Sequence, residues 1–156
     1  MPTNETNATD STSSRPAPGR LLALDLGTKR VGVAVCDEMR LSVRPLPTIP
    51  RESWKKLVGA VAQLVREFDA RGLVLGLPLR LDGSEGDAAV EARRLARNFG
   101  LTLGLPVHLQ DERLTSRAAE ETLRDAQKTG AEIAARVDGE AAALILRDFI
   151  ARGSEP

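Results

Sequence analysis

The order of apolar segments along this chain limits it to a mixed α/β fold. Three short strand-type segments come first, and single apolar runs then alternate with stretches of helical spacing. Such alternation is typical of parallel strands covered by helices. The sequence therefore predicts an α/β domain with a central mixed sheet of five strands, in which three antiparallel strands precede the parallel ones and helices flank the sheet.

The predicted strands are short and end at turn residues or prolines. Residues 20–27 and 31–36 are separated by three residues, which is short enough for a hairpin or another tight connection. Residues 41–49 include two prolines, so a strand there lies at an edge of the sheet or is brief. Two later apolar runs, residues 73–77 and 106–110, complete the predicted sheet.

Helices are predicted where apolar side chains recur at spacings of three and four. Ser53 can serve as the N-cap of the first helix, and Gly100 follows the last apolar position of the second. The predicted helices cover residues 57–68, 88–99, about 115–128 and about 132–150.

Composition excludes several classes of protein. The formal net charge is +0, although residues 20–71 hold 10 Lys or Arg against 6 Asp or Glu, so a basic surface would be local. Aromatic residues make up 3% of the chain, too few for a platform that stacks a run of single-stranded bases. A single Cys excludes a disulfide framework and a Cys-based zinc site, and it suits the cytoplasm.

The ends and the apolar runs indicate how the chain is organised. Residues 1–19 are mostly Thr, Asn, Ser, Pro and Ala, a composition that buries too little to fold, and we expect a disordered tail. Residues 20–152 form the predicted domain. No apolar run approaches the roughly 20 residues of a membrane-spanning helix, so we expect no membrane partner.

Asp25 interrupts a segment that otherwise reads as a strand buried on both faces. A lone buried carboxylate costs several kcal/mol unless a cation or hydrogen-bond donors meet it, which makes Asp25 a candidate for a functional site. The alternative is an aspartate at a strand end that accepts hydrogen bonds from the turn that follows.

Asp138 is a second carboxylate in an unexpected place. On a helix, its neighbours three and four positions away are four alanines, whereas the charged residues of this segment lie on other sides. Asp138 therefore projects from the face that packs on the sheet, where ionised side chains are rare unless they are paired or bind a metal. The alternative is a cap or a buried salt bridge to an Arg.

Asp111 and Glu112 end the last predicted strand, at the sheet edge where ligands bind in open α/β folds. Alternation places the two side chains on opposite faces, so only one of them can meet Asp25. Three converging carboxylates would suit two Mg²⁺ or Mn²⁺ ions and a phosphodiester displacement. The alternative is an ordinary acidic loop.

Three other chemically distinctive side chains are predicted to be structural. Cys36 lies in an apolar strand and reads as a small core residue. His108 is expected to be a packed or edge histidine, and Trp54, at the start of a helix, to anchor packing and not to stack on a base.

Four segments resemble, in order and spacing, motifs of the YqgF (RuvX) family. They are LLALDLGTKRVGVAV, GLPLRLDGSEG, DERLTSRAAE and RVDGEAAALIL, and the resemblance extends over about residues 20–150. It implies a ribonuclease H-like fold, similarity to Holliday-junction resolvases, and a metal-dependent nuclease that matures the 5′ end of pre-16S rRNA in ribosome biogenesis.

The resemblance also implies where the chemistry takes place. The family's acidic site falls on Asp25, Glu112 and Asp138, which would be the catalytic residues and the ligands of Mg²⁺ or Mn²⁺. It selects Glu112 over Asp111, a choice that alternation alone leaves open.

A set of turn and basic residues would face the nucleic-acid backbone: Gly27, Thr28, Lys29, Arg30 and Arg113. The expected partner is nucleic acid, either structured or single-stranded RNA or a DNA junction. We expect the protein to be cytoplasmic and to be a monomer or a homodimer.

Two other functions remain open from sequence. One is a nuclease of Holliday junctions or other DNA structures in recombination and repair, which would need a dimer to make paired cuts. The other is a non-catalytic RNA-binding factor associated with transcription, against which the three intact acids argue.

Overall fold

A mixed five-stranded sheet forms the centre of the molecule. The computed structural model describes residues 19–112 and 131–153. The strands are β1 (Leu21–Leu26), β2 (Arg30–Cys36), β3 (Val43–Pro50), β4 (Gly72–Leu77) and β5 (Val107–Asp111). Their order in the sheet is β3-β2-β1-β4-β5, with β1, β2 and β3 antiparallel and with β1, β4 and β5 parallel. The predicted sheet is therefore confirmed.

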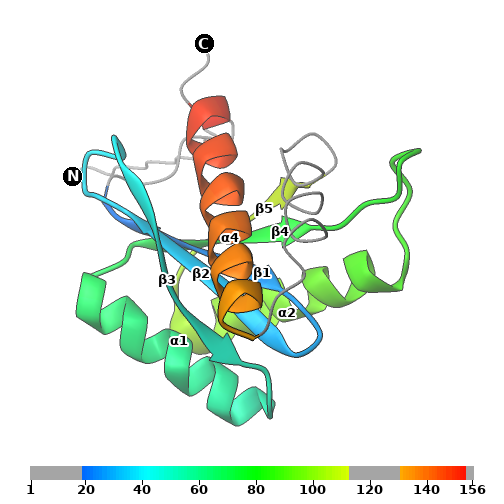
Figure 1. The fold of residues 1–156 in the computed structure, drawn as a ribbon, viewed down its shortest axis with the longest axis horizontal. Coiled ribbons are helices and arrows are strands. Elements are labelled where there is room, and N and C mark those ends of the chain that lie inside the picture. The colour runs from blue at the N-terminus through cyan, green and yellow to red at the C-terminus, as the bar shows by residue number, and fades with distance from the viewer. Residues whose placement is uncertain (1–18, 113–130, 154–156) are drawn as a thin grey trace, which may run out of the picture.

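Helices cover both faces of this sheet. The described helices are α1 (Trp54–Phe68), α2 (Asp87–Leu103) and α4 (Ala131–Gly153). α1 and α2 lie on one face, and α4 crosses the other (Figure 1). Side chains of β1 alternate between the two layers: Leu22 and Leu24 pack with the residues of α1 and α2, and Leu21 and Ala23 pack with those of α4.

The prolines of β3 have the expected consequence. β3 is an edge strand of the sheet, and Pro45 pairs there with Ala34 of β2. Proline has no amide proton to donate to a ladder, so an edge, with one side unpaired, accommodates it. The edge location predicted from sequence is confirmed.

The ends of the helices follow local rules, with one correction. The Ser53 side chain accepts a hydrogen bond of 3.2 Å from the amide of Lys56, so Ser53 caps α1 as predicted. Gly100, however, does not end α2, which continues to Leu103. The helix ends where Gly104 takes a φ of +68°, a left-handed conformation that glycine adopts without strain.

Two predictions fall outside the residues that the structure describes. One is the disordered tail, of which residues 1–18 are not described, and the other is the helix expected at about residues 115–128. Among the described helices, none is long and apolar enough to span a membrane.

Candidate active site

Asp25 lies near the carboxyl end of β1, with glycines on both neighbouring strands. Its exposed fraction is 6%, and it is directly opposite Gly32 of β2. The parallel register pairs Leu24 with Leu75, which brings Asp25 beside Gly76 of β4. By alternation from Ala23, the Asp25 side chain is on the face that α4 covers.

Gly32 lets α4 approach the sheet at this point. A Cβ atom on Gly32 would overlap the backbone carbonyl oxygen of Asp138, and it would come within 3.3 Å of the Asp138 Cβ. The backbone of α4 therefore lies directly on β2, across the ladder from Asp25. Only glycine leaves room for this contact.

Gly76 provides the same kind of space for Glu112. A Cβ atom on Gly76 would overlap the Glu112 carboxylate and would lie 2.8 Å from the Cδ1 of Ile145, a residue of α4. The amide of Glu112 donates a hydrogen bond of 3.2 Å to the carbonyl oxygen of Leu77. This bond extends the pairing of β4 and β5 by one residue and fixes the chain from which the Glu112 side chain projects.

Gln110 completes a row across four strands. In the ladder between β4 and β5 it pairs with Gly76, so the row runs Gly32, Asp25, Gly76 and Gln110. Gln110 is 3% exposed, and Asp25 and Gln110 are the buried polar or charged side chains in the described part of the chain. Buried polar side chains mark a position where packing alone would favour an apolar residue.

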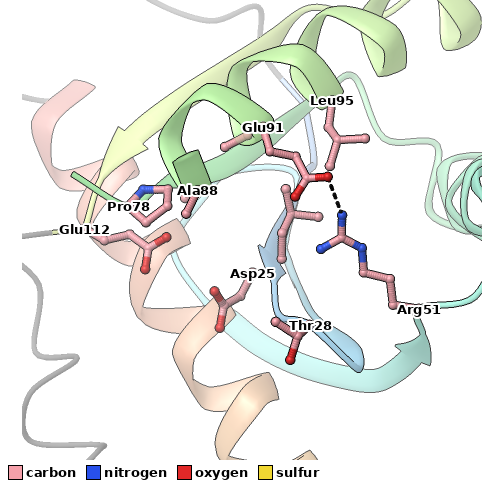
Figure 2. Close-up of a pocket in the computed structure, with 11 residues that line it drawn as sticks. Asp25, Thr28, Arg51, Pro78, Ala88, Glu91, Leu95 and Glu112 are labelled. Atoms are coloured by element: carbon pink, nitrogen blue, oxygen red, sulfur yellow. Dashed lines mark ion pairs between the residues drawn. The ribbon is translucent and has the colours of Figure 1, made fainter. Parts of the chain in front are cut away.

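Asp25 and Glu112 line one cavity of about 200 Å³. Figure 2 shows their carboxylates pointing toward the same space, with Thr28 beside Asp25. An ion pair between Arg51 and Glu91, 3.3 Å apart, lies on another side of the cavity. The structure thus brings together two of the three predicted catalytic acids, from positions 87 residues apart in the sequence.

Asp138 is close to this cavity but has a different partner. The Nε of Arg30 donates a hydrogen bond of 2.9 Å to its Oδ2, and the exposed fractions of the two side chains are 32% for Arg30 and 16% for Asp138. This is the salt bridge to an Arg that sequence offered as the alternative for Asp138. Arg30, predicted to face nucleic acid, directs its Nε to α4.

The turn between β1 and β2 is tight, and Arg51, which follows β3, stabilises it by a hydrogen bond to Gly27. The amide of Gly27 donates a hydrogen bond of 3.0 Å to the carbonyl oxygen of Arg30, and a Cβ on Gly27 would lie 2.6 Å from that oxygen. Thr28 and Lys29 are exposed at the tip. Arg113, the last residue predicted to bind the backbone, lies outside the described residues.

Arg51 and Glu91 are site residues that the sequence analysis missed. The Nη1 of Arg51 donates a hydrogen bond of 2.9 Å to the carbonyl oxygen of Gly27, so Arg51 stabilises the turn. Arg51 also lines the cavity. Nothing local marks Arg51 or Glu91, because one follows an edge strand and the other is on the polar face of a helix. The two glycines did carry a signal, since an isolated glycine in a strand suggests close approach of another segment.

The donor atoms of this site fit a hard divalent cation. Asp25, Glu112 and Asp138 offer only carboxylate oxygens, the ligands that Mg²⁺ and Mn²⁺ prefer. Within the described ranges, no three His, Cys, Asp or Glu side chains are grouped closely enough to hold a metal ion. Asp25 and Glu112 are the pair that share the cavity, and Asp138 is held by Arg30.

Cys36 and His108 have structural surroundings. The amide of Leu21 donates to the Cys36 Sγ at 3.2 Å, and burial raises the pKa of this thiol. The His108 ring packs against Phe149 with centroids 5.0 Å apart, and burial lowers the pKa of His108. Both side chains therefore have the packing roles predicted from sequence.

Comparison with known proteins decides the family. A family model described as RuvX, Holliday junction resolvase, matches residues 19–152. The chain belongs to the RuvX family. Relatives agree: a "Putative pre-16S rRNA nuclease" of Syntrophus aciditrophicus is 44% identical over 131 residues, 84% of this chain and 87% of the relative. One of the same name from Rhodopseudomonas palustris is 43% identical over 137 residues, 88% of this chain and 86% of the relative.

The fold of this RuvX-family chain is also that of a known resolvase. T. thermophilus RuvC, in complex with a Holliday junction substrate, superposes with a TM-score of 0.51 at 16% identity, over 87% of this chain and 96% of RuvC. The ribonuclease H-like fold is thus confirmed. The family assignment confirms the expectation of a nuclease, a hydrolase that acts on phosphodiester bonds.

Proposed function

We propose that this RuvX-family nuclease matures the 5′ end of pre-16S rRNA in the cytoplasm, with Asp25, Glu112 and Asp138 as its catalytic acids. One domain over residues 20–152 carries the activity. The observation that carries the proposal is the cavity that Asp25 and Glu112 line together, at the carboxyl ends of parallel strands. The rRNA substrate rests on the name that the relatives bear.

Mg²⁺ or Mn²⁺ is the cofactor of this proposal, because the three acids offer only hard oxygen ligands. When bound between such carboxylates, divalent ions activate a water nucleophile and stabilise the leaving oxygen of a phosphodiester. Asp25 would be the central ligand, Glu112 would bind from the other wall of the cavity, and Asp138 would exchange its Arg30 partner for the cation.

The protein's own residues hold these acids in place. The two glycines beside Asp25 allow the backbone of Asp138 and the carboxylate of Glu112 to approach it. Thr28 and Lys29 are exposed at the adjoining turn, where backbone amides and a cation can meet phosphate oxygens of the substrate. Arg51 secures that turn through its bond to Gly27.

Cleavage of DNA junctions is the second candidate function. It is favoured by the description of the family as a Holliday junction resolvase and by the fold shared with RuvC. This reaction would require two copies of the chain to make paired cuts. A non-catalytic RNA-binding factor would have no need for Asp25 and Glu112 to share one cavity.

A cleavage assay on a panel of substrates tests the proposal. The purified full chain is incubated with labelled precursor 16S rRNA, single-stranded DNA and a four-way DNA junction, each with Mg²⁺, Mn²⁺ or EDTA. We expect metal-dependent cutting of the rRNA precursor near the mature 5′ end. Symmetric cutting of the junction with the rRNA left intact would support the second candidate, and tight RNA binding without any cutting would support the binding factor.

A further inference from the structure

A second hollow along α1 and α2 adjoins the active-site cavity. This second hollow, which we call the Trp54 groove, has a volume of about 360 Å³. Its lining residues are Arg51, Glu52, Ser53, Trp54, Leu57, Arg94, Leu95 and Asn98. Arg51 and Leu95 line the groove and the active-site cavity alike, so the two spaces adjoin. A chain that passes the acids can therefore continue past Arg51 into the groove.

The guanidinium groups at this junction are suited to a phosphate. Arg51 and Arg94 both pair with the same carboxylate oxygen of Glu91, each at 3.3 Å. A single carboxylate thus faces two cations. The Glu52 carboxylate in the groove is already paired with Lys56 at 3.2 Å. The junction keeps a net positive charge, and because Nη1 and Nη2 of Arg51 are engaged by Gly27 and Glu91, Arg94 is the guanidinium better placed to take a phosphate oxygen.

Trp54 offers a held aromatic surface in the groove. Its ring packs against that of Phe99, with centroids 4.9 Å apart and an interplanar angle of 58°. Phe99 is fully buried, so it is a fixed support, whereas Trp54 remains 37% exposed. The ring thus packs as the sequence predicts, but its exposed part also allows it to stack on a base, contrary to that prediction, and its contact with Phe99 limits the side-chain freedom lost on stacking.

Asn98 adds a polar side chain to the groove that Trp54 lines. It is half-buried, lines the groove, and is on the helix turn after Arg94. An amide side chain carries a donor and an acceptor in one plane and can hydrogen-bond the edge of an unpaired base.

We propose that the Trp54 groove binds one unpaired nucleotide of the substrate strand, next to the bond that is cut. The base stacks on Trp54, Asn98 bonds its edge, and Arg94 binds the adjoining phosphate beside the positive charge of Arg51. This inference rests on the proposed function, because it takes the acids of the adjoining cavity as the site of cleavage. It specifies single-stranded nucleic acid, since only an unpaired base exposes its face.

The only Trp of the chain makes the proposal directly measurable. The full-length protein is titrated in EDTA with a short single-stranded RNA, with an oligomer of the same length and charge that lacks bases, and with duplex RNA. We expect the single-stranded RNA to quench Trp54 fluorescence and the other two to leave it nearly unchanged. Equal responses to all three, or no response, would overturn the proposal.

Variants of the groove separate binding from structure. Asn98→Ala and Arg94→Ala should each raise KM for a single-stranded substrate by about three- to tenfold, the loss of one hydrogen bond to a base or a phosphate, with kcat unchanged. Arg97→Ala is the matched control, because Arg97 is exposed on α2 and lines neither cavity. An unchanged KM in both groove variants would overturn the proposal.

The two proposals can fail separately. If the protein cuts none of the substrates but single-stranded RNA still quenches Trp54, the groove stands and the nuclease function fails. If the protein cuts, and neither Trp54 fluorescence nor KM responds as expected, the groove is wrong and the nuclease function stands.

Discussion

Arg30 and Asp138 are 108 positions apart in the sequence, yet the Arg30 Nε donates a hydrogen bond of 2.9 Å to the Asp138 Oδ2. The pair joins the first residue of β2 to α4, across the face of the sheet that bears Asp25. Both side chains are partly buried. The bond therefore fixes a proposed catalytic acid in the protein's resting state.

Removal of this cation should destabilise the fold. Arg30→Gln leaves the Asp138 carboxylate partly buried without its guanidinium, and we expect a loss of about 1–3 kcal/mol in the free energy of unfolding. Urea denaturation measures it. The control is Arg71→Gln, whose pair with Asp69 is exposed on both sides and should contribute less than about 1 kcal/mol. Equal losses in the two variants would show that burial of the pair has no effect.

The approach of α4 to the sheet depends on Gly32. We expect Gly32→Ala to cost about 1–3 kcal/mol or more, because the new methyl group meets the backbone of Asp138, and to lower cleavage by moving that residue. Gly59→Ala is the control, since a Cβ there has no atom within 4 Å and Gly59 is inside α1. It should gain about 0.5–1 kcal/mol. Thermal denaturation of both variants measures these changes. If Gly32→Ala is as stable as the wild type, α4 does not pack on Gly32 as described.

Glu112 and Asp111 are adjacent carboxylates that should differ in function. Glu112 lines the cavity with Asp25, whereas Asp111 pairs with Leu77 in the ladder and is on the other face by alternation. We expect Glu112→Gln to lower kcat about a hundredfold or more and Asp111→Asn to leave it within about threefold. If Asp111→Asn lowers kcat more than Glu112→Gln does, Asp111 and not Glu112 belongs to the active site.

Burial of His108 should make the fold sensitive to mild acid. Burial lowers the pKa of His108 from its ordinary value of 6.5. As pH falls below about 6.5, the unfolded chain binds a proton that the folded chain does not, so the free energy of unfolding decreases. His108→Leu should remove that part of the pH dependence. Urea denaturation at pH 7.5, 6.5 and 5.5 checks it, and parallel curves for both proteins would contradict it.

The sequence predicts the fold better than it predicts the site. Strand and helix periods are local, and they predicted the sheet and its edge strand. They missed the end of α2, because a helix can contain Gly100 and ends where Gly104 adopts a positive φ. The small neighbours of Asp138 indicated that it faces the sheet, and the structure places its backbone against Gly32.

Local patterns could not predict which side chains meet in the site, because these side chains come from segments far apart in the sequence, whereas the family resemblance did place Asp25 and Glu112 together. Alternation separates Asp111 from Glu112, but the choice between them depends on which face α4 covers. Nothing near Arg30 indicates that it pairs with Asp138. Arg51, which follows β3, joins the site through a hydrogen bond to Gly27, which follows β1, and no local pattern contains this contact.

The most direct test of this account is single-turnover cleavage of labelled precursor 16S rRNA by the wild-type protein and by Asp25→Asn, with Mg²⁺ or Mn²⁺. The substitution keeps the shape of the side chain and removes the charge at the centre of the proposed site. We predict loss of cleavage with an unchanged circular dichroism spectrum. The melting temperature should stay within a few degrees of the wild type, which corresponds to roughly 1 kcal/mol in the free energy of unfolding. Cleavage by the folded variant at the wild-type rate would contradict the assignment of the active site.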